Sequence, residues 1–437
     1  MKLFTVSLGC DKNLVDSEHM IAIMCDNGYE ITDDENEADV IVINTCCFIH
    51  DAKQESIDTI LEMARLKDNK LKALVVCGCL AARYESEIKK EIPEVDACLP
   101  ALEWEKIEET VAGVLSDKEK KDTVKGKRRV ISTPGHYEYL KIAEGCNRCC
   151  SYCIIPKMRG PYRSVPMEEL LEEARYLADE GVKELILVAQ ETTLYGTDLY
   201  GKKMLPELLC KLSEIDGIRW IRLLYAYPEE ITEELAHVMS THPKICRYID
   251  MPIQSGCDSV LKRMGRHTDS EGIKKTVRML REKMPDICIR TTFITGFPGE
   301  SQKDFEETYR FINEMEFDRL GVFVFSPEEG TKAYGFDGRV SAKTAKKRSD
   351  ELYELQQAIA FEAAEDMKGK ELTVMIDGYL PDDDVYVGRS YKDAPDIDGL
   401  VFVEAKRQLM TGDMIKVRVT GAKGYDLEGE MTDESSE

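Results

Sequence analysis

The sequence contains no long hydrophobic run. Although 43% of its 437 residues are hydrophobic, no uninterrupted apolar stretch approaches the ~18 residues that a membrane-spanning helix needs. The first ten residues, MKLFTVSLGC, also lack the basic segment and long apolar stretch of a secretory leader. These absences argue against membrane insertion and export, so we expect a cytoplasmic protein without a membrane partner.

Positive charge is scarce. The chain has 59 Lys and Arg against 83 Asp and Glu, which gives a formal net charge of −24 at pH 7. Such a charge repels phosphate backbones at long range and favours basic partners, although a local basic patch would still bind nucleic acid. The overall charge therefore disfavours a nucleic-acid substrate.

Cysteine, by contrast, is abundant, with 15 residues. We do not expect a disulfide framework in a chain without an export signal, because the cytosol keeps thiols reduced. Metal binding or redox chemistry must therefore account for at least some of these cysteines.

Apolar and amphipathic segments divide the chain into three predicted domains. In residues 1–116, short apolar runs such as LFTVSLG, DVIVIN and LKALVV alternate with helical patterns. This alternation predicts an open parallel α/β sheet with flanking helices. Residues 117–136 begin with a charged, aperiodic stretch, DKEKKDTVKGKRR, and we interpret them as a linker.

The second predicted domain, residues 137–368, alternates six apolar runs with helical patterns of ten or more residues. Six strand–helix units predict a TIM-like but open barrel, a partial (β/α)6 fold. The final segment, residues 369–437, changes to five short alternating runs, which predict a small closed β-barrel. The six apolar runs are residues 139–143, 184–189, 220–225, 248–253, 287–294 and 320–325.

Three cysteines lie close together directly after the first apolar run of the second domain. Cys146, Cys150 and Cys153 have C-x3-C-x2-C spacing within EGCNRCCSYC. Three thiolates can hold three irons of a [4Fe-4S] cube and leave the fourth iron open. A tetrathiolate zinc site that includes Cys149 is the alternative, although zinc-binding cysteine pairs are usually a dozen or more residues apart.

The first domain carries a second set of three cysteines. Cys10, Cys46 and Cys79 each follow an apolar run, in SLGC, NTCC and CGC. Because ligands of open parallel sheets bind outside the carboxyl ends of the strands, we expect these thiols to converge there and hold a second cubane cluster. The alternatives are ordinary core cysteines, or ligation by the neighbouring Cys47 or Cys77.

The C-x3-C-x2-C spacing, with Tyr152 before the last cysteine, resembles that of the radical S-adenosylmethionine (SAM) superfamily. The resemblance implies that the open iron binds SAM and reduces it to a 5′-deoxyadenosyl radical, which removes an unactivated hydrogen. It also makes Tyr152, Gln190 and Glu191 in LVAQETT, and Gly296 in FITGFPGE, cofactor contacts. A polar strand end and a glycine-rich turn are the alternative interpretations of these last two segments.

The whole chain resembles the methylthiotransferase family of radical SAM enzymes. The likeness rests on SLGCDKNLVDSE, NTCCFIHDAKQES and GCLAARY, on the triple-cysteine motif, and on the small C-terminal barrel, a TRAM domain. It implies that Cys10, Cys46 and Cys79 hold the auxiliary cluster of the family and that the triple-cysteine motif holds its radical cluster. Two [4Fe-4S] clusters and SAM are thus the expected cofactors.

This family has two branches that differ in substrate. The MiaB-like branch modifies an adenosine beside the tRNA anticodon, and the RimO-like branch modifies an aspartate of small-subunit ribosomal protein S-twelve. The segments AQETTLYGTDLYG, SPEEGTKA and GRSYKDAPDIDG resemble the RimO-like branch. One departure is PIQSGCD at residues 252–258, where a histidine is expected after the glutamine.

Charge supports the RimO-like branch. From Lys370 to the end, the chain has eight Lys or Arg against sixteen Asp or Glu. RNA binding depends on phosphate neutralisation, so an acidic barrel fits a basic ribosomal protein better than RNA. An ordinary solvated acidic surface is the alternative interpretation.

The resemblance implies a transferase that adds a methylthio group to the β-carbon of the substrate aspartate, with tRNA methylthiotransferase activity as the alternative. One SAM methylates sulfur at the auxiliary cluster, and a second gives the radical that removes hydrogen from the β-carbon. A basic ribosomal protein is the expected partner and tRNA is not. The reaction also needs a reductant and a sulfur donor, which the sequence does not identify.

Overall fold

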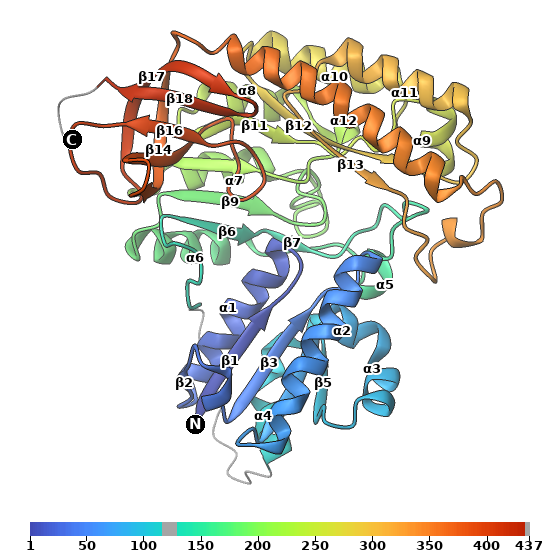
Figure 1. Cartoon of the computed structure of the whole chain (residues 1–437), viewed down its shortest axis with the longest axis vertical. Helices are drawn as coiled ribbons and strands as arrows, with labels where there is room; N and C mark the ends of the chain where they lie inside the picture. Colours follow the sequence, from blue (N-terminus) through green and yellow to red (C-terminus); the bar gives the residue numbers. More distant parts are fainter. Residues whose placement is uncertain (116–128, 433–437) are drawn as a thin grey trace. The chain divides into compact units, whose positions relative to one another are not determined.

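The computed structural model describes residues 1–115 and 129–432 (Figure 1). The chain forms two compact units. Most of the predicted linker, residues 117–128, lies outside the described residues. No helix in the described part of the chain is both long and apolar enough to span a bilayer. Unit 1 comprises Met1–Ser132, Tyr139–Val165 and Ser326–Thr331, and unit 2 comprises Thr133–Glu138, Pro166–Phe325 and Lys332–Glu437.

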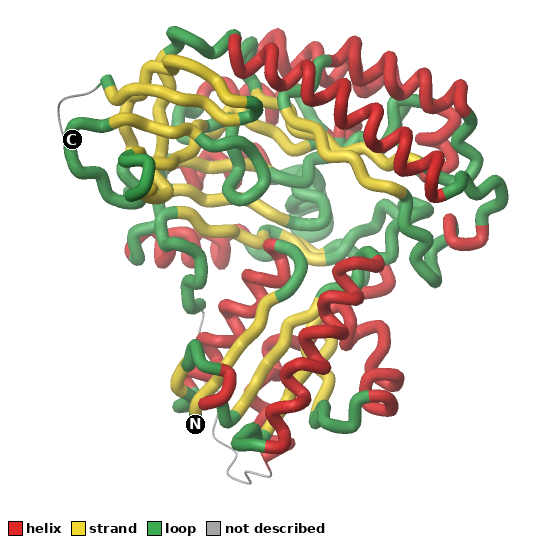
Figure 2. The backbone as a smooth tube through the Cα atoms, in the orientation of Figure 1, coloured by secondary structure: helices red, strands yellow, loops and turns green. Residues whose placement is uncertain are grey.

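Unit 1 is built on a five-stranded parallel sheet with strand order β2-β1-β3-β4-β5. Figure 2 shows its strands flanked by helices. Its central strands β3 and β4 are buried at every position because helices cover both faces. The strand order reverses between β1 and β3, which is where such sheets bind ligands. The strands are β1 (Lys2–Ser7), β2 (Glu30–Ile31), β3 (Val40–Thr45), β4 (Ala73–Gly78) and β5 (Ala97–Pro100).

Alternate side chains of β3 point into two different hydrophobic cores, one on each face of the sheet in unit 1. Val40 and Val42 pack against α1 (Asp11–Asp26) and α4 (Ile107–Leu115), whereas Ile41 and Ile43 pack against α2 (His50–Ala64) and α3 (Cys79–Glu91). The predicted open parallel sheet is confirmed. The unit also contains a small hairpin and a short helix, namely β7 (Ala143–Glu144), β8 (Arg163–Ser164) and α5 (Ile155–Met158).

Strands β9 to β13 of unit 2 form a parallel array within a six-stranded sheet of strand order β13-β12-β11-β10-β9-β6, whose last strand, β6, begins in unit 2 and ends in unit 1. The sheet does not close on itself, so the predicted partial barrel is confirmed. The strands are β6 (Tyr137–Lys141), β9 (Glu184–Val188), β10 (Trp220–Leu223), β11 (Ile245–Asp250), β12 (Cys288–Thr295) and β13 (Arg319–Val324). The helices are α6 (Met167–Asp179), α7 (Leu205–Ser213), α8 (Glu233–Thr241), α9 (Asp258–Met264), α10 (Ser270–Lys283), α11 (Gln302–Met315) and α12 (Ala342–Glu365).

One strand is displaced from its predicted position. The apolar run at residues 248–253 predicts a strand there, but β11 spans Ile245–Asp250. Met251 and Ile253 are fully buried in the loop that follows. Apolarity therefore continues beyond the strand because the loop is also part of the core.

The C-terminal segment closes into the predicted five-stranded barrel, with strand order β14-β15-β16-β18-β17. Its interior consists of aliphatic side chains such as Val374, Val401 and Val417. The strands are β14 (Glu371–Leu380), β15 (Val385–Ser390), β16 (Val401–Glu404), β17 (Met414–Lys423) and β18 (Asp426–Met431).

Buried ion pairs join this small barrel to the six-stranded sheet within unit 2. Glu184, at the start of β9, accepts hydrogen bonds from Arg222 Nε and from Arg389 Nη1 of β15, both at 2.7 Å. None of the three side chains is more than 2% exposed. Burial raises the pKa of Glu184, but the charges of Arg389 and Arg222 outweigh burial and lower it.

We predict that Glu184→Gln strongly destabilises unit 2, because it leaves two buried arginines without their shared carboxylate. Breaking a buried ion pair in this way costs about 3–5 kcal/mol. Urea unfolding followed by Trp220 fluorescence in a Trp104→Phe background measures the loss. Glu207→Gln, which breaks an exposed pair with Lys211, should change stability by only about 0.5 kcal/mol. Equal midpoints for the two variants would contradict the prediction.

Candidate functional site

The first set of cysteines lies at the carboxyl ends of three neighbouring strands in unit 1. Cys10 follows β1 and is the N-cap of α1, Cys46 follows β3, and Cys79 opens α3 after β4. Since β1, β3 and β4 are adjacent and parallel, these ends meet at one edge of the sheet. The structure thus brings the three predicted residues together where open parallel sheets bind ligands.

These thiols are largely buried and lie within electrostatic reach of one another. Cys46 and Cys79 are 7% and 5% exposed, whereas Cys10 is half-buried. Burial raises the pKa of Cys46 to about 11, and the charges of Cys10 and Cys79 contribute to this rise. Bound metal would relieve this repulsion, because it supplies positive charge and displaces the thiol protons.

The backbone at this edge suits a cluster held by three thiolates. At Gly9, φ is +94° and an added Cβ would lie only 2.5 Å from Cys46 Cβ and 2.9 Å from its Sγ. Only glycine therefore lets the loop approach Cys46 so closely. The N-termini of α1 and α3 also provide partial positive charge beside Cys10 and Cys79. Three such ligands fit a [4Fe-4S] cluster with one open iron.

The neighbouring cysteines occupy core positions. Cys47 belongs to the core beneath α2 and α3, and its Sγ lies 3.2 Å from Met158 Sδ. Cys77 belongs to the opposite core, beneath α1 and α4, and is 2% exposed. Both thiols thus have packing roles.

The second set of cysteines forms a compact loop between β7 and α5. Cys146 and Cys150 are each 6% exposed, and the Cys153 backbone N–H donates to the Cys150 carbonyl at 3.0 Å. Burial raises the pKa of Cys153 to about 12, with contributions from the charges of Cys150, Cys146 and Cys149. The three predicted ligands therefore also lie together, while Cys149 is exposed and has a left-handed backbone, with φ of +54°. Tyr152, within this loop, is half-buried.

Both cysteine sets belong to unit 1. The buried Arg159, which nothing in the sequence singles out, pairs with residues near both sets. Arg159 Nη1 lies 2.8 Å from Asp16 Oδ2 on α1 and 2.8 Å from Glu144 Oε2, two residues before Cys146. Asp16 and Arg159 are separated by 143 positions in the chain.

The other predicted cofactor contacts lie at strand ends in unit 2. Gln190 and Glu191 follow β9, and Glu191 is fully buried. Thr193 Oγ1 donates a hydrogen bond to Glu191 Oε1 at 3.1 Å. Gly296 follows β12 with φ of +74°, and an added Cβ would collide with Ala345 of α12. The glycine thus allows α12 to approach β12.

Two strained residues mark the same edge of the six-stranded sheet. Tyr225 after β10 and Gln254 after β11 have φ of +58° and +78°, which is unfavourable for residues other than glycine. Such strain is found most often at functional sites. Neither residue type signals this conformation in the sequence.

Gln254 also belongs to the segment that departs from the RimO-like pattern. Ser255, where a histidine is expected, is 2% exposed and its Oγ lies 3.3 Å from Thr308 Oγ1. At Gly256 an added Cβ would lie 2.5 Å from Phe311 Cβ. The departure thus gives two small residues that pack beneath α11.

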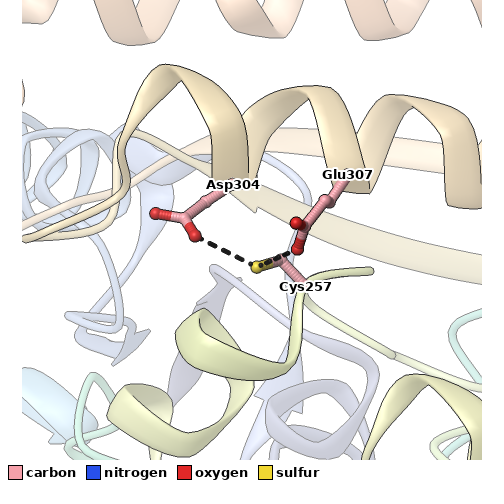
Figure 3. A group of neighbouring side chains, drawn as sticks. All are labelled: Cys257, Asp304 and Glu307. Carbon is pink, nitrogen blue, oxygen red and sulfur yellow. Dashed lines mark hydrogen bonds between the residues drawn. The ribbon is translucent and has the colours of Figure 1, made fainter.

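A polar cluster beside this segment has a structural explanation. Figure 3 shows the Cys257 thiol between the carboxylates of Asp304 and Glu307, with Sγ to oxygen distances of 3.3 and 3.1 Å. Burial raises the pKa of Cys257 to about 11, so its thiol keeps its single proton and can donate it to either carboxylate. Asp304 also completes a capping box with Ser301 at the start of α11.

We predict that Asp304→Ala costs about 1 kcal/mol of stability at neutral pH, the usual value for a lost cap. Burial raises the pKa of Asp304, but hydrogen bonds, above all from Ser301, lower it to about 2. The folded pKa is thus below the unfolded one, so the stabilisation is present above pH ~4 and disappears as pH falls through 2. The urea midpoint of the variant should therefore lie closer to that of the parent at pH 3 than at pH 7. A constant difference would contradict this assignment.

Family models match most of the chain. The uncharacterized protein family UPF0004 matches residues 2–100, the Radical SAM superfamily matches residues 140–312, and the TRAM domain matches residues 369–432. Among solved structures, the radical SAM methyltransferase TsrM from Kitasatospora setae has a TM-score of 0.58 at 14% identity, covering 85% of this chain and 78% of that one. The radical enzyme OxsB has a TM-score of 0.52 at 12% identity, covering 82% and 56%. These likenesses show the fold.

Curated relatives align over nearly the full length. The protein from Lachnoclostridium phytofermentans named ribosomal protein uS12 methylthiotransferase RimO is 55% identical, covering 98% of this chain and 99% of the relative. A protein of the same name from Thermoanaerobacter is 48% identical, covering 97% and 98%. The chain therefore belongs to the RimO family of ribosomal protein uS12 methylthiotransferases.

Proposed function

We propose that this protein is a radical SAM methylthiotransferase that adds a methylthio group to the β-carbon of an aspartate in ribosomal protein uS12. The observation that carries the proposal is that one compact unit holds two sets of three cysteines, each suited to a cubane cluster with one open iron. The names of the full-length relatives support the choice of substrate.

In this proposal each residue set has a separate task. The bound clusters and SAM supply the radical and sulfur chemistry. The protein holds the clusters, orients SAM and the aspartate, and shields them from water. Cys10, Cys46 and Cys79 are the auxiliary ligands, Cys146, Cys150 and Cys153 are the radical ligands, and Tyr152, Gln190, Glu191 and Gly296 contact SAM.

The functional domains in this proposal are residues 1–116, 137–368 and 369–437, with residues 117–136 as the linker. The protein acts in the cytoplasm, where the reducing environment keeps its thiols available for iron.

The surface of the small barrel gives less support for a protein partner than its composition suggests. Asp393 and Asp398 are buried and pair with Arg319 and Arg290, so they add little to the surface charge. Exposed acids at residues 382–384 are offset by exposed bases such as Lys416 on β17. The substrate assignment therefore depends on the relatives and the branch motifs more than on charge.

Anaerobic turnover tests the proposal. Reconstituted enzyme with SAM, sulfide and dithionite is offered uS12 and anticodon-arm tRNA in parallel, and both are analysed by mass spectrometry. We expect one methylthio group on uS12 and none on the tRNA. Modification of tRNA alone would overturn the substrate assignment and leave the two-cluster chemistry in place.

A further inference from the structure

Arg159 lies at the centre of a buried polar network in unit 1. It is the C-cap of α5 and is 1% exposed. Besides its contacts with Asp16 and Glu144, its Nη2 donates a hydrogen bond to Asn13 Oδ1 on α1. Lys141 Nζ completes the network by binding Asp16 and, at 3.1 Å, Glu144.

The charges in this network balance. Arg159 and Lys141 are the two cations, and Asp16 and Glu144 are the two anions. A balanced group is what a buried site tolerates, because an unpaired charge there is costly. Removing one member therefore changes the net charge of the site by one unit, in a direction that depends on which member is removed.

Arg159 also lies close to the cysteines of the auxiliary set, Cys10, Cys46 and Cys79. Asn13, which accepts a hydrogen bond from Arg159, itself donates from Nδ2 to the carbonyl of Thr45 at 3.1 Å, directly before Cys46. Arg159 also interacts electrostatically with Cys46, Cys79 and Cys10. Arg159 is thus the member of the network that brings positive charge to these thiols.

We propose that Arg159 is a positioning residue that sets the reduction potential of the auxiliary cluster. Its buried positive charge lies beside this site and offsets the negative charge of the three thiolates. Positive charge close to a cluster favours its reduced form, so Arg159 raises the potential. The inference rests on the proposed ligand set of Cys10, Cys46 and Cys79.

The test uses the full-length variant with Cys146, Cys150 and Cys153 changed to Ala, which retains only the auxiliary site. After reconstitution with iron and sulfide, a redox titration followed by electron paramagnetic resonance gives the midpoint potential. Adding Arg159→Gln should lower the equilibrium constant for one-electron reduction at least tenfold. This corresponds to a midpoint potential lower by about 59 mV. Arg159→Lys, which keeps the charge, should restore more than half of this shift.

Glu144→Gln tests the direction in which the reduction potential changes. This substitution removes a carboxylate that shares Arg159 with the cysteines, so it should raise the potential instead of lowering it. Arg129→Gln is the matched control, because Arg129 is equally buried in unit 1 and pairs with Glu18 at 3.3 Å. Its potential should equal that of the parent.

The outcomes separate this inference from the proposed function. Unchanged potentials in the Arg159 variants, or shifts of the same sign in Arg159→Gln and Glu144→Gln, would overturn the role of Arg159. If Arg159→Gln binds no iron, Arg159→Lys and Glu144→Gln decide the question. A triple-cysteine parent without any cluster would overturn the ligand set itself, and with it this inference.

Discussion

Changing Cys146, Cys150 and Cys153 to Ala together should abolish 5′-deoxyadenosine formation from SAM and remove about half of the iron. The reason is that these thiols form one loop between β7 and α5, whereas the other three proposed ligands lie at strand ends of the separate parallel sheet. The retained auxiliary site should still bind iron. Iron analysis and chromatography of the reaction products measure both effects.

The control for this experiment is Cys149→Ala. Cys149 belongs to the same loop but is exposed and outside the predicted ligand set, so this variant should form 5′-deoxyadenosine at the parental rate. Continued 5′-deoxyadenosine formation in the triple variant would show that the radical cluster is held elsewhere. A loss in Cys149→Ala equal to that of the triple variant would instead favour a site with four thiolates.

Changing Cys10, Cys46 and Cys79 to Ala should have the complementary effect. This variant should still cleave SAM to 5′-deoxyadenosine but should add no methylthio group to any substrate. The expectation follows from the structure, because the three residues occupy one edge of the sheet without contributing to the loop of the radical motif. Mass spectrometry of uS12 and product chromatography from the same reaction provide the measurement.

Two neighbouring cysteines are the matched controls. Cys47→Ala and Cys77→Ala each remove a core thiol one or two positions from a predicted ligand. Both should keep the parental iron content, although each loses some packing energy. Iron loss in either of them, with iron retained in the Cys10, Cys46 and Cys79 variant, would show that a neighbour is the true ligand.

Much of the fold could be predicted because parallel strands buried on both faces produce continuous apolar runs. β3 and β4 are examples, since every residue in them is buried. The positions of Cys10, Cys46 and Cys79 could be predicted for the same reason, because each directly follows such a run. The error at β11 arose where a buried loop, with Met251 and Ile253, continued the apolar pattern beyond the strand.

Other features depend on contacts between distant residues and have no local signal. The residues of Tyr139–Val165 join unit 1, and the ion pairs of Arg159 with Asp16 and of Lys141 with Asp16 connect them to α1. A charged residue in KMRG resembles a surface residue when only the sequence is considered. Similarly, Tyr225 and Gln254 have left-handed backbones that only the surrounding strands impose.

The most direct test of the central claim uses uS12 labelled with deuterium at the β-carbons of its aspartates. After anaerobic turnover with SAM, sulfide and dithionite, mass spectrometry follows the label in 5′-deoxyadenosine and locates the methylthio group on uS12. The account predicts that deuterium appears in 5′-deoxyadenosine and that the methylthio group is on an aspartate that has lost one deuterium. A methylthio group on another residue type, or 5′-deoxyadenosine without deuterium, would contradict it.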